Sequence, residues 1–310
     1  MAGPSRAAAS PGAGGTLYVV ATPIGNLADV TLRALEVLRT VPLIAAEDTR
    51  IARRLLGRHG IETRLASFHA RSGPGRLAAL VEHLSGGADL ALVTDAGTPG
   101  VSDPGDELVR AWAETGGTVV PIPGPSAALA ALVASGVAGP RWSFEGFLPR
   151  SGKTRRERLL RMSADERATV VFEAPGRVAE TLADLAATCG PDRPAAVCRE
   201  LTKLHEEIVR GTLGSLATAA ATGELTLRGE FVIVVGDQVV ARSSARGSPD
   251  VPGSSIAEAT ATLAEAKAEM TRLMAEGAAR GEAARRAAER FGVTRRALYD
   301  APDREGGPSR

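Results

Sequence analysis

The stretch "LVTDAGTPGVSDPG" (residues 92–105) decides how this chain folds. It starts inside an apolar run, residues 90–93, and continues with three glycines, two prolines and two aspartates, Asp95 and Asp103. A short continuous apolar run is typical of a strand buried on both faces of a parallel sheet, and glycine and proline end such a strand. We therefore predict a buried strand that carries a stiff, acidic loop at its carboxyl end.

The residues around this stretch alternate between strand patterns and helix patterns. Leu32, Leu35 and Leu38 have helical spacing, and Asp48 is placed to cap a helix that stops at Gly60. This order predicts an N-terminal α/β domain, residues 16–124, with a mostly parallel sheet and helices on both faces. Its expected strands cover residues 16–21, 41–47, 63–68, 89–94 and 118–123, and its expected helices cover 30–39, 48–60, 75–87 and 106–117.

A second α/β domain is predicted for residues 125–238. The connection over residues 201–208 is too short for a crossover, so some neighbouring strands are expected to be antiparallel. Residues 239–255 are rich in serine, glycine and proline, which indicates a linker.

The C-terminal part is helical in pattern from residue 256 to residue 301. Within it, residues 281–301 are similar to a helix-turn-helix with its turn at Gly292. The core of this small module is expected to contain Ala283, Ala287, Phe291, Val293, Leu298 and Tyr299. Residues 1–15 are predicted to be a disordered tail and residues 302–310 a second tail.

Bulk composition excludes several classes of protein. The 310 residues are 44% apolar and carry a net charge of +1, so a large core is expected and no strong overall field attracts nucleic acid or membrane. The longest apolar run, residues 127–138, is too short to span a bilayer, and residues 1–15 lack the apolar core of a signal peptide. Cys189 and Cys198 fit neither a disulfide framework nor a metal site by spacing. We expect a soluble cytoplasmic protein with two reduced thiols and no metal.

Three loops that combine glycine with proline follow expected strands: "ATPIGN" (21–26), the opening stretch, and "PIPGPSAA" (121–128). Parallel sheets bind their ligands at this edge. No G-x-G-x-x-G follows the first strand and no Walker motif occurs, which argues against a pyrophosphate ligand. Asp95 and Asp103 are able to accept hydrogen bonds from a ribose, an ammonium group or an amide. The alternative is that both aspartates only cap turns and helices.

Seven segments in order across residues 16–240 resemble the tetrapyrrole methylase family: "LYVVATPIGNLADVTLRALEVL", "AAEDTR", "LVTDAGTPGVSDPG", "VVPIPGPSAALAAL", "FEGFLPR", "CRELTK" and "GEFVIVV". The resemblance implies two α/β domains that hold S-adenosyl-L-methionine between them, and a homodimer. More narrowly, the chain is similar to the branch that methylates the ribose 2′-hydroxyl of a cytidine in 16S ribosomal RNA; its end "GVTRRALYD" is similar too. The loop "SFHARSG" (67–73) departs from that branch, which carries more amides after the histidine, so no role is assigned to His69.

By the same resemblance, the cofactor contacts fall at Ile24, Asp95, Ala96, Gly97, Gly100, Ser126, Ala127, Ala174 and Leu201. Many of these residues are apolar or glycine, as expected where the backbone makes the contact. A ribose hydroxyl is a poor nucleophile, so a base near it is expected. The sequence does not single that base out, and the candidates are Glu47, Asp48, Asp103, Glu173, Glu200, Lys203 and His205. For each of them, a helix cap or a surface ion pair is the alternative.

Two basic segments are candidates for RNA contacts. Residues 150–161 hold six Lys or Arg against one Glu, and residues 280–296 hold six Arg against two Glu. Cations in such segments bind phosphates, although a solvated helix face is the usual meaning of a charge run. The predicted contacts are Lys153, Arg155, Arg156, Arg158, Arg295 and Arg296. The C-terminal module has the alternative role of packing a dimer.

These observations together predict an S-adenosylmethionine-dependent 2′-O-methyltransferase acting on a cytidine of 16S ribosomal RNA, within the small ribosomal subunit. Two alternatives share the body, namely a methyltransferase that acts on a tetrapyrrole (uroporphyrinogen or a precorrin) and a diphthine synthase. The third alternative is a DNA-binding regulator that uses the body as a sensor, because the helix-turn-helix pattern fits that class as well.

Overall fold

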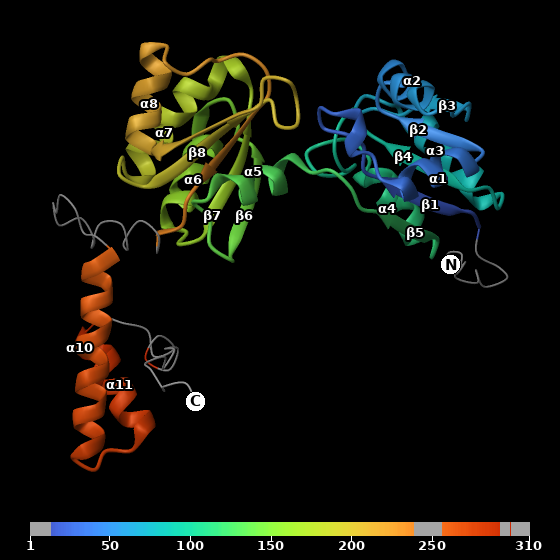
Figure 1. Cartoon of the computed structure of the whole chain (residues 1–310). Coiled ribbons are helices and arrows are strands. Elements are labelled where there is room, and N and C mark those ends of the chain that lie inside the picture. Colours follow the sequence, from blue (N-terminus) through green and yellow to red (C-terminus); the bar gives the residue numbers. More distant parts are fainter. Residues whose placement is uncertain (1–13, 239–255, 292–297, 299–310) are drawn as a thin grey trace. The chain divides into compact units, whose positions relative to one another are not determined.

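The computed structural model describes residues 14–238, 256–291 and 298. The chain divides into two compact units, residues 1–245 and residues 246–310, and each is described by itself. The first unit contains two five-stranded sheets, each with its own helices (Figure 1), and we call these halves the N-terminal lobe and the second lobe. The predicted linker, the C-terminal tail and the N-terminal tail up to residue 13 lie outside the described residues.

The sheet of the N-terminal lobe is entirely parallel, with the strand order β3-β2-β4-β1-β5. β4 lies between β2 and β1, and all four of its residues are buried, as expected from the apolar run that leads into the opening stretch. The predicted parallel sheet is therefore confirmed. The strands are β1 (Thr16–Val20), β2 (Leu43–Ala46), β3 (Leu65–Ser67), β4 (Leu90–Val93) and β5 (Thr118–Ile122).

Helices cover both faces of this sheet, as predicted. Leu38 and Leu56 of α1 and α2 belong to the core on one face, whereas Leu84 and Trp112 of α3 and α4 belong to the core on the other. Asp48 caps α2 by accepting a hydrogen bond from the backbone N–H of Arg50 at 2.8 Å. The helices are α1 (Leu32–Thr40), α2 (Thr49–Arg58), α3 (Pro74–Ser85) and α4 (Asp106–Glu114), with a short 3₁₀ turn, η1 (Leu27–Asp29), before α1.

The neighbouring strands β1 and β4 send the chain to opposite faces of the sheet. β1 is followed by α1 on one face, and β4 is followed by α4 on the other. The direction of the chain thus changes between these two neighbouring strands, and open α/β sheets bind ligands outside the carboxyl ends of strands at such a point. The turn into α4 requires Gly105, because its φ is +134° and an added Cβ would lie 2.7 Å from Cδ2 of Leu92.

The sheet of the second lobe is mixed, with the order β6-β7-β10-β8-β9. Only β6 and β7 are parallel, and β7–β10, β10–β8 and β8–β9 are antiparallel. The antiparallel neighbours predicted from the short connections are thus confirmed. The strands are β6 (Trp142–Phe147), β7 (Ala168–Glu173), β8 (Pro194–Arg199), β9 (Glu207–Thr212) and β10 (Phe231–Val235).

Alternate residues of these strands face two different cores. Val171 and Ile233 pack with α6, α7 and α8, whereas Val170 and Val232 pack with α5 and with Ile24 of the N-terminal lobe. Ile24 therefore joins the two lobes through apolar contact. Cys189 and Cys198 carry free thiols. The helices are α5 (Ala127–Ser135), α6 (Gly152–Ala164), α7 (Val178–Cys189) and α8 (Leu213–Thr222), with a 3₁₀ turn, η2 (Pro175–Arg177), before α7.

The second unit pairs α10 (Ile256–Ala275) with α11 (Arg280–Phe291). Ala283, Ala287 and Leu298, three of the predicted core residues, are buried. The predicted turn at Gly292 and the residues Val293, Arg295, Arg296 and Tyr299 lie outside the described residues. None of the described helices combines the length and the apolar character needed to cross a membrane.

Candidate functional site

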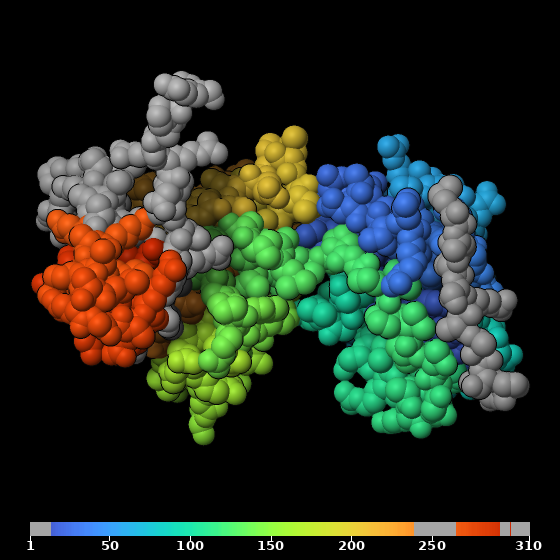
Figure 2. All heavy atoms as spheres, turned by 60° about the horizontal axis from the view of Figure 1, so that its bottom comes forward, coloured from blue at the N-terminus to red at the C-terminus, as the bar shows by residue number. Residues whose placement is uncertain are grey.

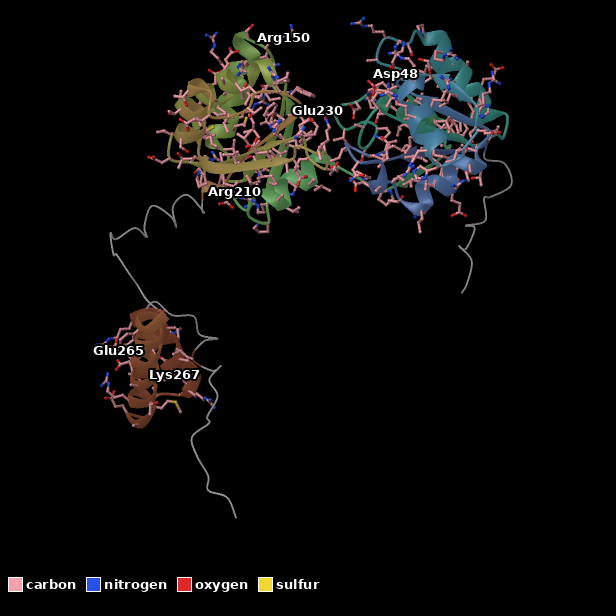
Figure 3. The ribbon with its side chains drawn as sticks, turned by 45° about the horizontal axis from the view of Figure 1, so that its top comes forward. Asp48, Arg150, Arg210, Glu230, Glu265 and Lys267 are labelled. Carbon is pink, nitrogen blue, oxygen red and sulfur yellow. The ribbon has the colours of Figure 1, made fainter. Side chains whose placement is uncertain are left out.

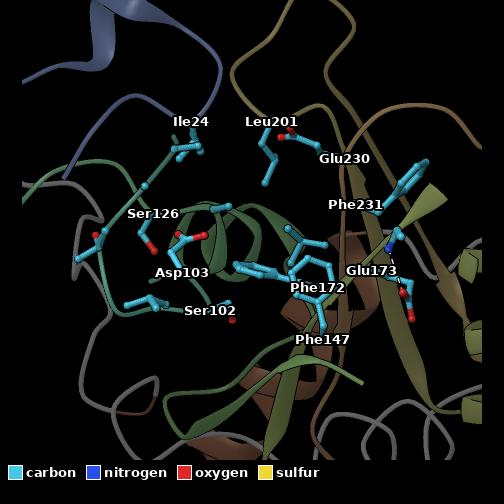
Figure 4. A pocket seen from close by; sticks show the side chains of 17 residues that line it. Ile24, Ser102, Asp103, Ser126, Phe147, Phe172, Glu173, Leu201, Glu230 and Phe231 are labelled. Carbon is cyan, nitrogen blue, oxygen red and sulfur yellow. Dashed lines mark hydrogen bonds between the residues drawn. The ribbon is translucent and has the colours of Figure 1, made fainter. Parts of the chain in front are cut away.

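A cavity of about 320 Å³ lies where the two lobes of the first unit meet (Figure 4). The loops after β1, β4 and β5 form one wall, and the ends of β6, β7 and β10 form the other. The space-filling view shows the surface hollowed between the blue-green and green lobes (Figure 2). Seven of the nine predicted cofactor contacts line this cavity: Ile24, Ala96, Gly97, Ser126, Ala127, Ala174 and Leu201.

The loops after β1 and β4 are held together by their backbones. The N–H of Thr22 donates to the carbonyl of Gly97 at 2.8 Å, and the N–H of Gly97 donates back to the carbonyl of Thr22 at 3.1 Å. Ser126 begins α5, where its Oγ accepts from the N–H of Leu129 at 3.5 Å. The first wall of the cavity is therefore a fixed backbone surface.

Asp95 and Gly100, the other two predicted cofactor contacts, do not line this cavity. Oδ1 of Asp95 accepts a hydrogen bond from the N–H of Asp48 at 3.0 Å, and the N–H of Asp95 donates to Oε2 of Glu47 at 3.3 Å. The side chain of Asp95 thus faces the end of β2 and the start of α2, because β2 and β4 are neighbours in the sheet. Asp95 therefore joins two strand ends, and its contact with the cofactor stays a prediction.

Asp103 is one of two predicted catalytic candidates that line the cavity; the other is Glu173. Burial, together with the smaller effect of the nearby negative charges of Glu47 and Asp95, raises the pKa of Asp103 to about 6. Within the described part of the chain, no hydrogen-bond donor or cation engages its carboxyl group. A half-buried carboxylate with free lone pairs and a raised pKa is suited to accept a proton.

The acidic pair at the end of β2 has a different environment. Arg50 holds Asp48 through three side-chain hydrogen bonds and lowers the pKa of Asp48 to about 2. Burial raises the pKa of Glu47, which does not line the cavity. Across residues 14–238, 256–291 and 298, no three His, Cys, Asp or Glu side chains are grouped to hold a metal ion.

Glu173 lines the cavity, but its carboxylate is fully engaged by its own lobe. Oε2 of Glu173 accepts from the hydroxyl of Thr181 at 2.6 Å, and Oε1 accepts from the N–H of Ala174 at 2.8 Å. The guanidinium of Arg177 lies 3.3 Å from Oε1. Glu173 therefore fixes the turn after β7 and is not free to take a proton from a ligand.

Glu200 and Lys203, two of the candidate bases, form an ion pair with 2.8 Å between Nζ and Oε1. Neither residue lines the cavity; Nζ of Lys203 also lies 3.1 Å from Oε2 of Glu230, which does line it. Glu230 lies on the side of the second lobe that faces the N-terminal lobe (Figure 3). His205 is exposed at the surface. The ion pairs of Lys203 with Glu200 and Glu230 therefore hold the edge of the cavity in place.

Three phenylalanines line the second wall, and the sequence analysis missed them. Phe147, Phe172 and Phe231 stand near the ends of β6, β7 and β10, which are neighbours in the sheet. The rings of Phe147 and Phe172 pack edge to face, with 5.7 Å between their centroids. The available signal was that "FEGFLP" and "GEFVIVV" each place a phenylalanine at a strand end in a chain with only six.

The basic helix α6 divides into buried and exposed cations. The side chain of Arg155 is 5% exposed; its guanidinium pairs with Asp184 at 2.8 Å and donates to Thr181 and to the carbonyl of Pro149. Arg155 therefore supports the lobe and has no free face for a phosphate, which corrects the expectation for this residue. Lys153 and Arg156 are exposed, and Arg158 is partly buried. Arg150, before the helix, projects from the surface (Figure 3).

Comparisons with known proteins give the family. The profile of the tetrapyrrole (corrin/porphyrin) methylases matches residues 16–217, more than half of the chain. The chain belongs to the tetrapyrrole methylase family. The fold class predicted from the sequence is therefore confirmed.

Several curated relatives of this tetrapyrrole methylase share one name, ribosomal RNA small subunit methyltransferase I. The relative from Xylella fastidiosa (strain Temecula1) is 44% identical over 92% of this chain and 98% of its own length. The relative from Bacillus subtilis (strain 168) is 40% identical over 93% and 94%. That from Escherichia coli O157:H7 is 41% identical over 92% and 93%.

Solved structures of other members of the family share the fold at low identity. A cobalt precorrin-4 methyltransferase superposes with a TM-score of 0.54 at 16% identity, covering 73% of this chain and 95% of its own. A diphthine synthase gives 0.55 at 15% identity, covering 76% and 97%. At this distance the likeness concerns the fold alone, so it does not favour the tetrapyrrole or diphthine alternatives.

Proposed function

We propose that this tetrapyrrole methylase transfers a methyl group from S-adenosylmethionine to the ribose 2′-hydroxyl of a cytidine in 16S ribosomal RNA. Its relatives at 40–48% identity make it an S-adenosylmethionine-dependent ribosomal RNA methyltransferase. The observation that carries the finer proposal is that seven predicted cofactor contacts and Asp103 line the same cavity. Such a convergence of loops at strand ends is the arrangement that cofactor enzymes use to position a reactive group.

The chemistry of the cavity fits this cofactor. S-adenosylmethionine, when bound, supplies a methyl group activated by a sulfonium centre. Ile24, Ala174 and Leu201 offer apolar surface to a flat ring, and the backbone at Ala96 and Gly97 offers polar groups to the amino-acid end. The carboxylates of Asp103 and Glu230 line the same cavity, where they would attract the positively charged sulfonium of the cofactor. The cavity volume of about 320 Å³ lies in the range of small-molecule sites.

Asp103 is proposed as the proton acceptor. It takes the proton of the 2′-hydroxyl as that oxygen becomes the nucleophile, and it releases the proton to solvent afterwards. The other cavity carboxylates are engaged, Glu173 by Thr181 and Glu230 by Lys203. Of the seven candidates that the sequence offered, Asp103 is thus the one on the cavity wall whose oxygens no described donor engages.

The substrate side of the proposal rests on charge and on the names of the relatives. Lys153, Arg156 and Arg158 are the proposed phosphate contacts on α6, and Arg295 and Arg296 remain proposed contacts of the C-terminal module. The substrate is proposed to be RNA within the small ribosomal subunit, which places the protein in the cytoplasm. A homodimer is proposed as well. Leu129 and Val133 on α5, 49% and 78% exposed, support it because an apolar pair at i,i+4 favours burial.

The test uses the full chain, tritiated S-adenosylmethionine and small ribosomal subunits that lack the modification. After digestion to nucleosides, the label is expected in 2′-O-methylcytidine. Label on a base, or transfer to uroporphyrinogen but not to RNA, would contradict the proposal. Matched incubations with S-adenosylhomocysteine in excess give the background, and the Asp103→Asn variant reports on the proton acceptor.

A further inference from the structure

Phe147 exposes an aromatic ring at the edge of the cavity. Its residue is 52% exposed, whereas Phe68 and Phe231 are almost completely buried. Leaving a phenylalanine half exposed forgoes part of the free energy that burial of its ring would supply. Because the ring lines the cavity and is not merely scattered on the surface, a ligand is the natural partner for its free face.

The ring is held firmly on the side that faces the protein. Phe172 packs against it edge to face at 5.7 Å, and Phe144 packs against Phe172 in the same manner at 4.9 Å. The backbone before it contains a register shift between Phe144 and Gly146 and is held there by Arg158, whose Nη1 donates to the carbonyl of Glu145 at 3.0 Å. A ring with this support presents its free face without loss of side-chain freedom on binding.

The cavity has two ends with different surroundings. Gly97 packs toward Ile24, and Gly25 packs toward the carbonyl of Leu201, so Ile24, Gly97 and Leu201 mark one end of the cavity. Phe147 lies at the other end with Ser102, whose Oγ would lie 2.8 Å from a Cβ placed on the adjacent Gly146. Figure 4 shows this separation, with Ile24 and Leu201 together and Ser102 near Phe147. Asp103 follows Ser102 in the chain and lines the same cavity.

Positive charge lies next to the backbone of Phe147, where Arg158 also pairs with Oε2 of Glu145 at 3.7 Å. Nη1 of Arg158 is 3.5 Å from the carbonyl oxygen of Phe147, and the side chain of Arg158 is 33% exposed. Lys153 and Arg156, on the same helix, are exposed. An aromatic face next to cations is the combination that binds a single-stranded nucleotide, since the base stacks on the ring and the phosphates meet the cations.

We propose that Phe147 is the stacking surface for the base of the target nucleotide, taken out of its RNA stack and placed at the Ser102 end of the cavity. This proposal rests on the proposed function, because it assigns the base of the nucleotide whose ribose faces Asp103. Base-modifying enzymes remove their target from the stack in this way, and an aromatic surface compensates for the stacking that is lost. The other possible occupant of this face is the adenine of the cofactor, and the experiment separates the two.

The experiment measures two affinities for four full-length proteins: wild type, Phe147→Ala, Phe147→Tyr and Leu160→Ala. Leu160 is the matched control, because it is 61% exposed on α6 and does not line the cavity. Binding of unmodified small ribosomal subunits is measured by filter retention in saturating S-adenosylhomocysteine. Binding of S-adenosylhomocysteine alone is measured by calorimetry.

We expect Phe147→Ala to weaken binding of the subunits about 10- to 100-fold, the range typical for loss of one base–aromatic stack. Phe147→Tyr and Leu160→Ala are expected to bind the subunits like the wild type, and all four proteins are expected to bind S-adenosylhomocysteine equally. Unchanged binding of the subunits by Phe147→Ala would overturn the proposal. A parallel loss of S-adenosylhomocysteine binding would overturn it too and assign the ring to adenine.

The outcomes also separate this proposal from the proposed function. If the wild type puts no methyl group on RNA but its binding of the subunits still depends on Phe147, the function fails and the stacking surface stands. If methylation occurs at a ribose but Phe147→Ala binds normally, the function stands and the stacking surface fails. If the wild type does not retain small subunits at all, both are overturned.

Discussion

Ser102 and Gly146 approach each other so closely that a Cβ on Gly146 would lie 2.8 Å from Oγ of Ser102. Ser102 belongs to the loop after β4 and Gly146 to β6, so this approach brings the two lobes together at one end of the cavity. Gly146 also has a φ of +60°, next to the register shift in β6. Both features favour glycine at this position.

Gly146→Ala is therefore expected to disturb the cavity as well as the stability of the fold. The strained backbone costs about 1–2 kcal/mol, and the contact with Ser102 moves the loop that carries Asp103. We expect a lower midpoint of denaturation and weaker binding of S-adenosylhomocysteine by calorimetry. Gly75→Ala, in α3 with open space around it, is the control and is expected to behave like the wild type. If the two variants have equal stability and equal binding, the close contact between Ser102 and Gly146 tolerates an added methyl group.

The pH dependence of methyl transfer tests Asp103 directly. Because burial raises the pKa of Asp103 to about 6, the carboxylate that accepts the proton is lost below that pH. The single-turnover rate is expected to fall about tenfold per unit below pH 6 and to level off above pH 7. Asp103→Asn is expected to be slow at every pH, with no such limb, and to bind S-adenosylhomocysteine normally. If the single-turnover rate of Asp103→Asn falls below pH 6 as steeply as that of the wild type, Asp103 is not the proton acceptor.

The same substitution is expected to stabilise the fold near neutral pH. The pKa of Asp103 is higher in the folded chain than its ordinary value of 3.8, so the folded state binds more protons between pH 4 and pH 6. The free energy of unfolding therefore falls as the pH rises through this window, and the charged form is unfavourable above it. Asp103→Asn removes this effect, and a gain of about 1 kcal/mol at pH 7.5 is expected, discounted for partial exposure. Urea denaturation at pH 4 and pH 7.5 measures it, and no difference between the two pH values would contradict the assignment.

Lys153 and Arg156 are expected to contribute phosphate contacts without contributing to the cofactor site. Replacing both by alanine should weaken binding of small ribosomal subunits and reduce the slope of log K against log salt by about 1.5. Binding of S-adenosylhomocysteine should stay unchanged. Arg141→Ala, which removes an exposed cation before the start of β6, is the control. If the double variant keeps the salt slope of the wild type, Lys153 and Arg156 contact solvent and not RNA phosphates.

Arg155, next to Arg156 in the chain, is expected to behave in the opposite way. Its guanidinium bonds Asp184, Thr181 and the carbonyl of Pro149 inside the second lobe. Arg155→Met removes the partner of the buried Thr181 and of the partly exposed Asp184 and Pro149, and a loss of about 1–3 kcal/mol in the free energy of unfolding is expected. Chemical denaturation measures this loss. If Arg155→Met has normal stability but binds RNA more weakly, Arg155 contacts a phosphate after all.

Much of the local structure followed from residue patterns. The strands of the parallel sheet were predicted within two residues of each end, because buried apolar runs between Gly and Pro turns leave few alternatives. Asp48 was predicted as a helix cap and is one. The seven cavity residues from Ile24 to Leu201 came from the resemblance to the family, and periodicity alone offered no means to find them.

The positions that pattern analysis missed or misplaced depend on neighbours distant in the chain. Arg155 and Arg156 are equivalent in a charge count, but α6 turns one toward Asp184 and the other toward solvent. Phe147 and Phe172 meet only because β6 and β7 pair in parallel. Asp95 meets the N–H of Asp48 only because β2 and β4 are adjacent in the sheet.

The sequence by itself determined the alternating α/β order, the buried strand that ends at Val93 and the stiff loops that follow the strands. These features depend on apolar runs and on the restricted dihedral angles of Gly and Pro, which act within a few residues. Only the tertiary structure decided which carboxylate has free oxygens on the cavity wall and which cations are exposed. Burial and hydrogen-bond partners are set by elements far apart in the chain, so they exist only once the two lobes have packed.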